Sequence, residues 1–314
     1  MSSGLSLKNK VRKLAIKFGL KQYLTPIHEI MNMRKATKLM RLYIPENTEY
    51  GLNTDERDYS ITISFTTFPA RIKSAIYVAD TMLRQTIKPD RVIMVLASDE
   101  LESKDELPKD FIQLEKRGLS IVFAENLKPH NKYQYAMRNY SESIIITVDD
   151  DILYPDDLVE TLYNSYKKHP NAVSAMRAHR LTFKDKKLLS YNDWEFESIY
   201  TDIPVFDLLA TGVGGVLYPP MCLIAKKDIL FDTSTIKKTC LFVDDIWLKT
   251  IELLCDIPVI LASQKPPNLL LVPSSQKISL QKKNVDENNN DKAIRDIMQH
   301  FGFSDDDIYN RIYK

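Results

Sequence analysis

The chain has 314 residues, 44% of them hydrophobic, which suits one large α/β domain with extensions and is enough to bury a substantial core. Its formal net charge of +1 argues neither for nor against a nucleic-acid partner, and we expect none. Three cysteines without a CxxC pair, no run of 18 apolar residues and no uninterrupted apolar N-terminal stretch argue against a disulfide framework, a transmembrane helix and a cleaved secretion signal. We therefore expect a cytoplasmic protein with reduced cysteines.

Basic residues are concentrated at the start of the chain. The first 50 positions carry ten Lys and Arg against three Glu, so the remainder is acidic. Val11, Leu14 and Phe18 recur at helical spacing, with lysines on the opposite side, which predicts a short amphipathic helix within 8–24. We interpret residues 1–50 as a basic helical arm, either packed on the body or resting on an anionic membrane surface.

Strand and helix patterns alternate from residue 61 onwards. Apolar runs that predict buried strands are followed by stretches whose apolar residues recur at helical spacing. The strands are expected at 61–65, 92–96, 119–123 and 144–148. This alternation predicts a doubly wound, mostly parallel sheet with helices on both faces, in which ligands bind beyond the carboxyl ends of the strands.

The second half of the chain is less regular. We expect a strand at 172–178, a loop or hairpin over 181–202, a helix over 245–255, a short strand at 259–261, a mobile polar loop over 281–292 and a last helix over 291–301. The predicted organisation is the arm (1–50), an α/β domain (59–275) and a C-terminal loop and helix (276–314).

Three adjacent aspartates follow the fourth predicted strand. Asp149, Asp150 and Asp151 would repel one another unless a cation lies there, and hard divalent ions such as Mg²⁺ and Mn²⁺ take carboxylate oxygens. Asp149 and Asp151, two residues apart, are placed to reach one ion together, which would then bridge to a diphosphate. The alternative is an acidic turn that caps the helix after Pro155.

A second acidic pair, Asp244 and Asp245, precedes an amphipathic helix. An aspartate in this position most often caps the helix. A carboxylate that faces a cleft instead is suited to act as a general base, taking a proton from an attacking hydroxyl group. Both interpretations hold at once if one carboxylate caps the helix while the other faces the cleft.

Three further segments supply candidates for ligand contacts. Gly214 and Gly215, in a glycine-rich turn, allow a ligand close to the backbone, although a tight turn explains them equally well. Thr66 and Arg71, at the end of the first strand, suit a nucleotide. Lys132, at the start of a helix, suits a phosphate, although a lysine on a helix is usually only solvated.

Histidines and aromatic residues give weaker signals. Each of His130, His179 and His300 is a candidate third metal ligand, but a lone histidine lies more often in the core or on the surface. The aromatic residues of the polar stretch are candidates for an acceptor-sugar platform or for the core, and they are Tyr191, Trp194, Phe196 and Tyr200.

Five segments together resemble one family. They are TTFPARI after the first strand, HNKYQYAMRNY, IIITVDDDILYP, GVGGVLYPP and VDDIWL. Over roughly residues 59–265 the chain resembles bacterial GT-A glycosyltransferases, distantly similar to family 2, of the kind that acts in capsular or lipopolysaccharide synthesis. The aspartate triplet followed by VDDIWL is the most specific part of this resemblance.

The resemblance implies a GT-A, Rossmann-like fold and roles for the acidic residues. Asp149 and Asp151 would hold Mn²⁺ or Mg²⁺ on the donor diphosphate, and Asp150 would lie against the ribose or the metal. Asp245 would act as the base. The family has a Glu-Asp pair where this chain has Asp244 and Asp245, which leaves the assignment between the two open.

Contacts to the donor are implied for the other segments. Thr66, Arg71 and Lys132 would contact the nucleotide, and Gly214 and Gly215 would line the donor or acceptor sugar. If Asp245 is the base, the acceptor hydroxyl would displace the nucleoside diphosphate in line, which would invert the anomeric centre.

The expected activity is transfer of a sugar from a nucleotide-diphosphate donor, with UDP favoured by analogy, to a glycan or lipid-linked saccharide. One alternative is a sugar-phosphate nucleotidyltransferase, against which the absence of glycine from 66–71 counts. Another is a non-catalytic, membrane-associated scaffold. If the arm binds lipid, we expect the protein at the inner face of the membrane.

Overall fold

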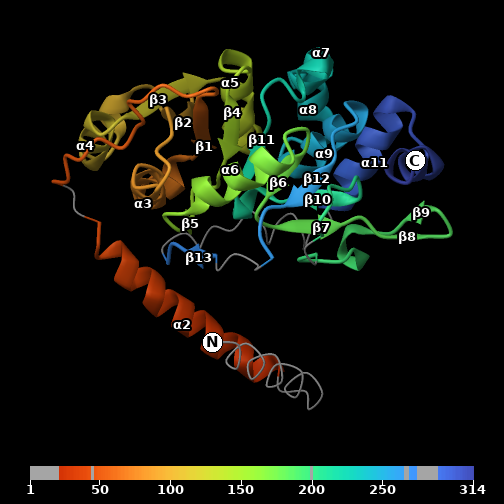
Figure 1. Ribbon diagram of the computed structural model, residues 1–314, viewed down its shortest axis with the longest axis horizontal. Coiled ribbons are helices and arrows are strands. Elements are labelled where there is room, and N and C mark those ends of the chain that lie inside the picture. Colours follow the sequence, from red (N-terminus) through yellow and green to blue (C-terminus); the bar gives the residue numbers. More distant parts are fainter. Residues whose placement is uncertain (1–20, 44–45, 199–200, 265–268, 274–288) are drawn as a thin grey trace.

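The structure is a computed structural model that describes residues 21–43, 46–198, 201–264, 269–273 and 289–314. Its centre is a seven-stranded mixed sheet with helices on both faces (Figure 1). The strand order is β12-β6-β11-β4-β1-β2-β3, in which β11 runs antiparallel to both of its neighbours and the other pairs are parallel. The predicted α/β fold with a mostly parallel, doubly wound sheet is confirmed.

The first four strands of the sheet lie where the apolar runs predict them. The strands of the sheet are β1 (Ile61–Thr66), β2 (Arg91–Ala97), β3 (Leu119–Ala124), β4 (Ile144–Thr147), β6 (Val173–Ala175), β11 (Val216–Tyr218) and β12 (Val259–Leu261). β1, β2 and β4 are buried almost throughout, as expected for central strands with helices on both sides. Because β1 and β4 are parallel neighbours, with Ser64 opposite Thr147, their carboxyl ends meet at one edge.

Two hydrophobic layers cover the sheet. One face is packed by α3 (Ile72–Met82), α4 (Asp110–Lys116) and α6 (Leu158–Lys168). The other face is packed by α5 (Asn131–Asn139), α8 (Thr233–Thr239), α9 (Asp244–Leu254) and α11 (Asn289–Phe301), with α7 (Lys227–Leu230) and α12 (Asp305–Ile312) beside them. Trp247 of α9 is wholly buried in this second layer, and its indole N–H donates to Leu230 O at 3.2 Å.

Short strands outside the sheet shape the rim above it. They form three pairs: β5 (Ile152–Leu153) with β13 (Leu270–Leu271), β7 (Ala178–Arg180) with β10 (Leu208–Ala210), and β8 (Phe183–Lys184) with β9 (Lys187–Leu188). The strand predicted at 172–178 is therefore two strands, β6 and β7, and the predicted hairpin excursion contains β8 and β9. Residues 281–288 of the predicted polar loop lie outside the described residues, and the loop's last positions already belong to α11.

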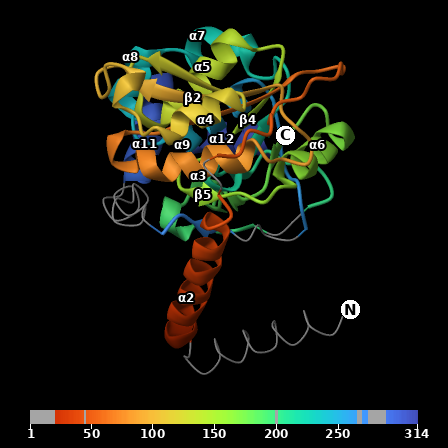
Figure 2. The same cartoon turned by 90° about the vertical axis from the view of Figure 1, so that its left-hand side faces the viewer.

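Helix α2 (Lys21–Met40) stands away from the body in both views (Figures 1 and 2). Its carboxyl-terminal part is anchored to the body, where Ala36 is wholly buried against Leu153 of β5, Leu270 of β13 and Val272. Because β5 follows directly after the aspartate triplet, the base of α2 lies one short strand away from the predicted metal-binding residues.

The outer part of α2 carries apolar side chains in solvent. Ile30, Met31 and Met33 are each about half exposed or more. The amphipathic helix predicted within 8–24 lies outside the described residues, except where α2 begins. None of the described helices is both long and apolar enough to span a membrane.

Candidate active site

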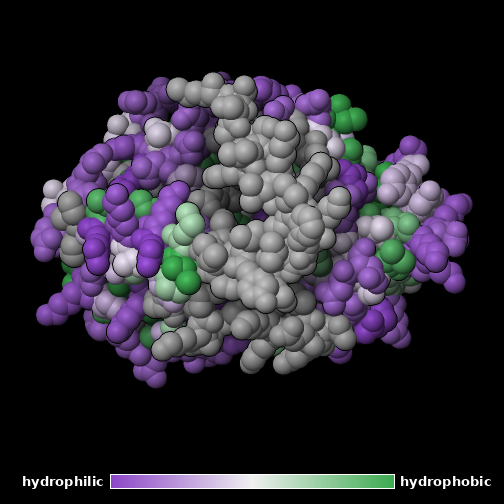
Figure 3. Space-filling view, turned by 90° about the horizontal axis from the view of Figure 1, so that it is seen from below, coloured by the Kyte–Doolittle hydropathy of each residue, from purple (hydrophilic) through white to green (hydrophobic). Residues whose placement is uncertain are grey.

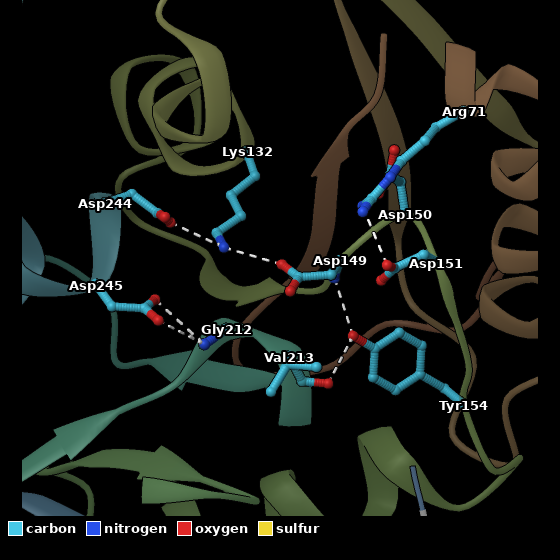
Figure 4. A network of polar contacts seen from close by, with 10 residues as sticks. All are labelled: Arg71, Lys132, Asp149, Asp150, Asp151, Tyr154, Gly212, Val213, Asp244 and Asp245. Carbon is cyan, nitrogen blue, oxygen red and sulfur yellow. Dashed lines mark hydrogen bonds and ion pairs between the residues drawn. The ribbon is translucent and has the colours of Figure 1, made fainter. Parts of the chain in front are cut away.

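A cleft of about 770 Å³ lies at the carboxyl ends of β1 and β4. The turn after β4, the short 3-10 helix η1 (Pro69–Arg71) after β1 and the first residues of α5 and α9 contribute to it. The loop around the 3-10 helix η5 (Gly212–Gly214) also contributes to the cleft lining, and Gly212 and Val213 lie next to the side chains of the acidic motifs (Figure 4). The two acidic motifs of the sequence, separated by about 95 residues, therefore face one cleft.

Arg71 and Thr67 hold the inner part of the aspartate triplet. Asp150 accepts from Thr67 Oγ1 at 2.7 Å and from Arg71 Nη1 at 2.8 Å, and Arg71 Nη1 also lies 3.1 Å from Asp151. Burial raises the pKa of Asp151 to about 7 although Arg71 opposes this, and the pKa of Asp150 is also raised by burial. Both oxygens of Asp150 are occupied, so this residue fixes Arg71 and the turn.

Lys132 joins the two acidic motifs. Its Nζ lies 2.9 Å from Asp149 Oδ1 and 2.8 Å from Asp244 Oδ2, and the residue is 5% exposed. Burial alone would lower the pKa of Lys132, but Asp149 and Asp244 outweigh it and hold the pKa well above its ordinary value. Burial likewise opposes ionisation of Asp244, yet Lys132 and His130 keep the pKa of Asp244 low. Lys132 and Asp244 are therefore a charged pair.

Asp245 differs from Asp244 in its environment. Its carboxylate accepts from the Gly212 backbone N–H, at 3.2 and 3.4 Å to the two oxygens, and it lines the cleft. Burial raises the pKa of Asp245, and the charges of Asp244 and Asp149 add to the rise. The N-cap position of α9 is Val243, and both aspartates lie in the first turn, where the helix dipole favours an anion.

Tyr154 and Gly212 complete this network, and the sequence interpretation did not select either of them. The Tyr154 hydroxyl accepts from Asp149 N at 2.9 Å and donates to Val213 O at 3.1 Å, which ties the triplet to the η5 loop (Figure 4). At Gly212, an added Cβ would overlap Lys132 Nζ and lie 3.2 Å from Asp149 Oδ1. Thr67 is a third residue of the network that the sequence interpretation did not select. Its position next to the candidate Thr66 is the feature of the sequence that could have indicated it.

The other predicted ligand contacts have mainly internal partners. Thr66 lines the cleft, but its hydroxyl donates to Val95 O at 2.8 Å. Gly214 packs on the backbone of Arg177, and Gly215 has a φ of 91° and faces Leu158. These contacts agree with the tight-turn interpretation of the glycines.

The three candidate histidines lie in different surroundings. His130 is wholly buried, with Nδ1 2.8 Å from Tyr133 Oη and Nε2 2.9 Å from Cys240 O, so both nitrogens are engaged. His300 lies beside Thr235, outside the cleft lining. His179 lines the cleft.

The aromatic candidates divide in the same way. Tyr191 and Phe196 line the cleft. Trp194 is buried and donates to Leu189 O at 2.8 Å, so it belongs to the core. Tyr200 lies outside the described residues.

The cleft is suited to a divalent cation whose coordination shell is completed by oxygen atoms of the substrate. Within the described residues, no group of three or more His, Cys, Asp or Glu side chains forms a ready metal cage. Mg²⁺ is commonly held by one or two carboxylates plus substrate phosphates, and Asp149 and Asp151 both line the cleft. The two motifs supply five aspartates, and the cations in ion-pair contact with them are Arg71 and Lys132, so negative charge is in excess among these residues. The donor set therefore fits Mn²⁺ or Mg²⁺.

A family model described as glycosyl transferase family 2 matches residues 73–212. The match covers a little under half of the chain. The matched segment includes Lys132, the aspartate triplet and Gly212, and it ends before Asp244. No curated protein matches the chain.

Solved structures of several transferases are similar to the chain at low identity. Mannosyltransferase PcManGT from Pyrobaculum calidifontis, in complex with GDP-Man and Mn²⁺, is 15% identical, with 92% of this chain and 74% of that chain covered and a TM-score of 0.43. A CMP-2-keto-3-deoxy-manno-octonic acid synthetase with CTP is 11% identical, with 65% and 89% covered and a TM-score of 0.38. UDP-glucose pyrophosphorylase from Acinetobacter baumannii is 10% identical, with 71% and 91% covered and a TM-score of 0.41.

Proposed function

We propose that the protein transfers a sugar from a nucleoside-diphosphate donor, with UDP favoured, to a glycan or lipid-linked saccharide, with inversion of configuration. The observation that carries this proposal is the Lys132 bridge between Asp149 and Asp244. It brings a metal-binding type of motif and a general-base type of motif to the two sides of one cleft. The family 2 match over 73–212 supports the same activity.

Asp149 and Asp151 are the residues that would hold Mn²⁺ or Mg²⁺. When bound, the ion supplies positive charge to the diphosphate as it leaves. Lys132 adds a second positive charge beside Asp149, and its burial strengthens its interaction with a phosphate. Asp150, held by Thr67 and Arg71, keeps the turn in place and leaves Arg71 at the nucleotide end of the cleft.

Asp245 is the proposed general base. Its raised pKa is suited to taking a proton from an acceptor hydroxyl near neutral pH, whereas Asp244 is committed to Lys132. We assign Asp244 as the residue that positions Lys132. The Gly212 N–H holds the Asp245 carboxylate in the cleft, so this carboxylate can direct the hydroxyl in line with the departing diphosphate.

Helix α2 is the proposed attachment to a membrane. The exposed side chains of Ile30, Met31 and Met33 lie on the same projecting helix as Lys35 and Lys38, a combination suited to an anionic interface. This location at the inner membrane face is consistent with a lipid-linked acceptor and with synthesis of capsular or lipopolysaccharide glycans. Anionic vesicles should bind the full chain more strongly than a chain lacking residues 1–50.

A donor screen tests the proposed reaction. The purified full chain is offered UDP-, GDP-, CMP- and dTDP-sugars with Mn²⁺, and nucleotide release is measured. We expect slow release from one nucleotide class. EDTA and Asp149→Asn should each abolish it, and Asp228→Asn, which removes an exposed carboxylate on α7, should leave it intact.

An enzyme that does not hydrolyse its donor in the absence of an acceptor would release no nucleotide in this screen. Calorimetry therefore measures the binding of nucleoside diphosphates with and without Mn²⁺. No release from any donor, combined with no Mn²⁺-dependent binding of any nucleotide, would refute the proposed activity.

A further inference from the structure

The half of the cleft beyond Asp245 contains a second set of polar and aromatic side chains. Arg177 and His179 come from the turn after β6 and from β7, and Tyr191 and Phe196 come from the excursion that follows. Thr211 completes this side. None of these residues contributes to the contacts that hold the aspartate triplet.

Arg177 differs from the other cations of the cleft. Among the described cationic residues that line the cleft, Arg71 and Lys132 each contact two aspartates, and Lys128 pairs with Glu100 at 2.7 Å. Arg177 instead has Glu197 as its carboxylate partner, at 3.5 Å, and the Glu197 side chain is 60% exposed. An ion pair this exposed contributes little, so another anion can replace Glu197 at small cost.

The guanidinium of Arg177 is connected to the proposed base through two consecutive residues, Thr211 and Gly212. Arg177 Nη1 donates to Thr211 Oγ1 at 3.2 Å, and Thr211 is followed by Gly212, whose N–H donates to Asp245. Tyr191 lies within the electrostatic reach of both charges, because Asp245 raises and Arg177 lowers the pKa of its phenol while burial raises it most. Arg177, Tyr191 and Asp245 therefore border one part of the cleft.

Aromatic rings form a cluster in the same half of the cleft as Arg177, with the rings of His179 and Tyr191 tilted by 60° and 53° relative to that of Phe196. The ring centroids of His179 and Phe196 are 4.5 Å apart, and those of Tyr191 and Phe196 are 5.5 Å apart. Rings of this kind offer the apolar face of a sugar a broad surface, as they offer other apolar groups. His179 Nδ1 accepts from the Glu197 N–H at 3.0 Å, which fixes the imidazole.

The backbone segments around Arg177 pack closely against one another. An added Cβ on Gly214 would lie 2.9 Å from Arg177 Cβ and 3.0 Å from Arg177 N, so a glycine is needed to seat this turn. Glu197 has a φ of 53°, a left-handed conformation that costs a non-glycine residue free energy. Such strain persists where the surroundings demand it and is found at ligand-binding sites.

We propose that Arg177 binds an oxyanion of the acceptor saccharide, displacing Glu197, while the sugar ring lies against Tyr191 and Phe196 and presents its hydroxyl to Asp245. The guanidinium fork matches a carboxylate or a phosphate through paired hydrogen bonds. The acceptor class is therefore an acidic saccharide, whose anion is either a sugar carboxylate or the phosphate of a lipid-linked sugar. This inference rests on the proposed transferase activity.

Four probes test this inference with the full chain, Mn²⁺ and the donor that the screen identifies. The first pair is methyl glucuronide and methyl glucoside, which differ in the carboxylate. The second pair is glucosyl octyl phosphate and octyl glucoside, which differ in the phosphate. The readouts are transfer to the probe and the KM for the acceptor and for the donor. We expect one anionic probe to be preferred to its neutral counterpart by about tenfold or more, since hydrogen bonds to charged groups are strong. The carboxylate pair and the phosphate pair identify the source of the anion.

Variants of Arg177 locate the effect. Arg177→Gln should raise the KM for the anionic acceptor about tenfold or more and remove the preference, with the donor KM unchanged. Arg177→Lys should restore part of the preference, and Glu197→Gln should retain it. Arg295→Gln, the same substitution on the exposed side of α11, is the matched control.

If the wild type hydrolyses the donor but uses charged and neutral probes equally, or uses none of the four probes, the proposal is overturned. A raised donor KM in Arg177→Gln would also overturn it, by assigning Arg177 to the donor diphosphate. Absence of both Mn²⁺-dependent nucleotide release and Mn²⁺-dependent nucleotide binding in the wild type would instead refute the underlying transferase activity.

Discussion

The Cα of Gly212 lies against the ammonium group of Lys132, so closely that a Cβ at this position would overlap the nitrogen. The same Cβ would stand 3.2 Å from Asp149 Oδ1, the partner of Lys132. The glycine therefore leaves room for the ion pair that joins the two acidic motifs, while its own N–H holds Asp245. One residue without a side chain serves both halves of the cleft.

Gly212→Ala should separate activity from stability. The atom that must move is the end of a flexible lysine, so we expect the free energy of unfolding to change by less than about 1 kcal/mol. Displacing a preorganised positive charge from the diphosphate position should lower Mn²⁺-dependent nucleotide release by about 10- to 100-fold. Denaturant unfolding and the release assay measure the two effects.

Gly51→Ala is the contrasting control for this substitution. Its Cβ would lie 2.6 Å from both Leu83 Cβ and Leu83 O, and a backbone atom cannot move aside as a lysine terminus can. We expect this variant to lose about 1–3 kcal/mol of stability and to keep its donor KM. Equal loss of stability in the two variants would contradict the flexible-lysine explanation.

Tyr154→Phe should loosen the link between the aspartate triplet and the η5 loop. The substitution leaves the Asp149 N–H and the Val213 carbonyl without the hydroxyl that joins them, which should cost about 1–3 kcal/mol in the free energy of unfolding. Because Asp149 is then less well positioned, the Mn²⁺ concentration that gives half-maximal activity should rise. Tyr163→Phe, on the partly exposed side of α6, is the control that should change neither quantity.

The part of the candidate site that lies directly after the strands of the sheet could be predicted from the sequence. An apolar strand followed by three aspartates is a local signal, and parallel strands bring their carboxyl ends together, so the positions of Asp149 and Arg71 at one edge follow from pattern alone. The contacts of Tyr154 and Gly212 depend on side chains that meet across 59 and about 80 residues, which no periodicity encodes. Such residues require the three-dimensional structure.

The second half of the fold was harder to predict for a related reason. β12 lies at its predicted bounds, 259–261, but the strand predicted at 172–178 is β6 followed by β7, and strands of three residues are too short for an apolar pattern to separate the two. α12 is a different case, because Ser304 and Asp307 form a capping box that the sequence displays openly. That helix was predictable and was not predicted.

Asp151→Asn should abolish the stabilisation that Mn²⁺ and UDP give together. A ligand at 100 times its Kd stabilises the folded state by about 2.7 kcal/mol, which a thermal shift assay detects as a higher Tm. The variant removes one of five clustered carboxylates, so its Tm without ligand should equal or exceed that of the wild type because repulsion is relieved. An unchanged ligand-induced shift in Asp151→Asn would remove this residue from the proposed metal site.

The pH dependence of transfer should identify which aspartate of α9 is the base. Burial, Asp244 and Asp149 raise the pKa of Asp245 above the ordinary carboxyl value of about 4. A base acts only when deprotonated, so kcat/KM should increase with pH up to about 8, the raised pKa of Asp245, and then level off. Asp245→Asn should eliminate this dependence and lower the rate about 100- to 10,000-fold.

Asp244→Asn should act on the same profile in a different way. Removing the Asp244 charge removes one cause of the raised pKa, so the increase should move to lower pH while activity falls through the loss of a Lys132 partner. If Asp244 were the base, its low pKa would place no titration near neutral pH, and Asp244→Asn rather than Asp245→Asn would be the inactive variant. The two substitutions therefore give opposite patterns for the two assignments, and an alkaline plateau that survives in Asp245→Asn would exclude Asp245 as the base.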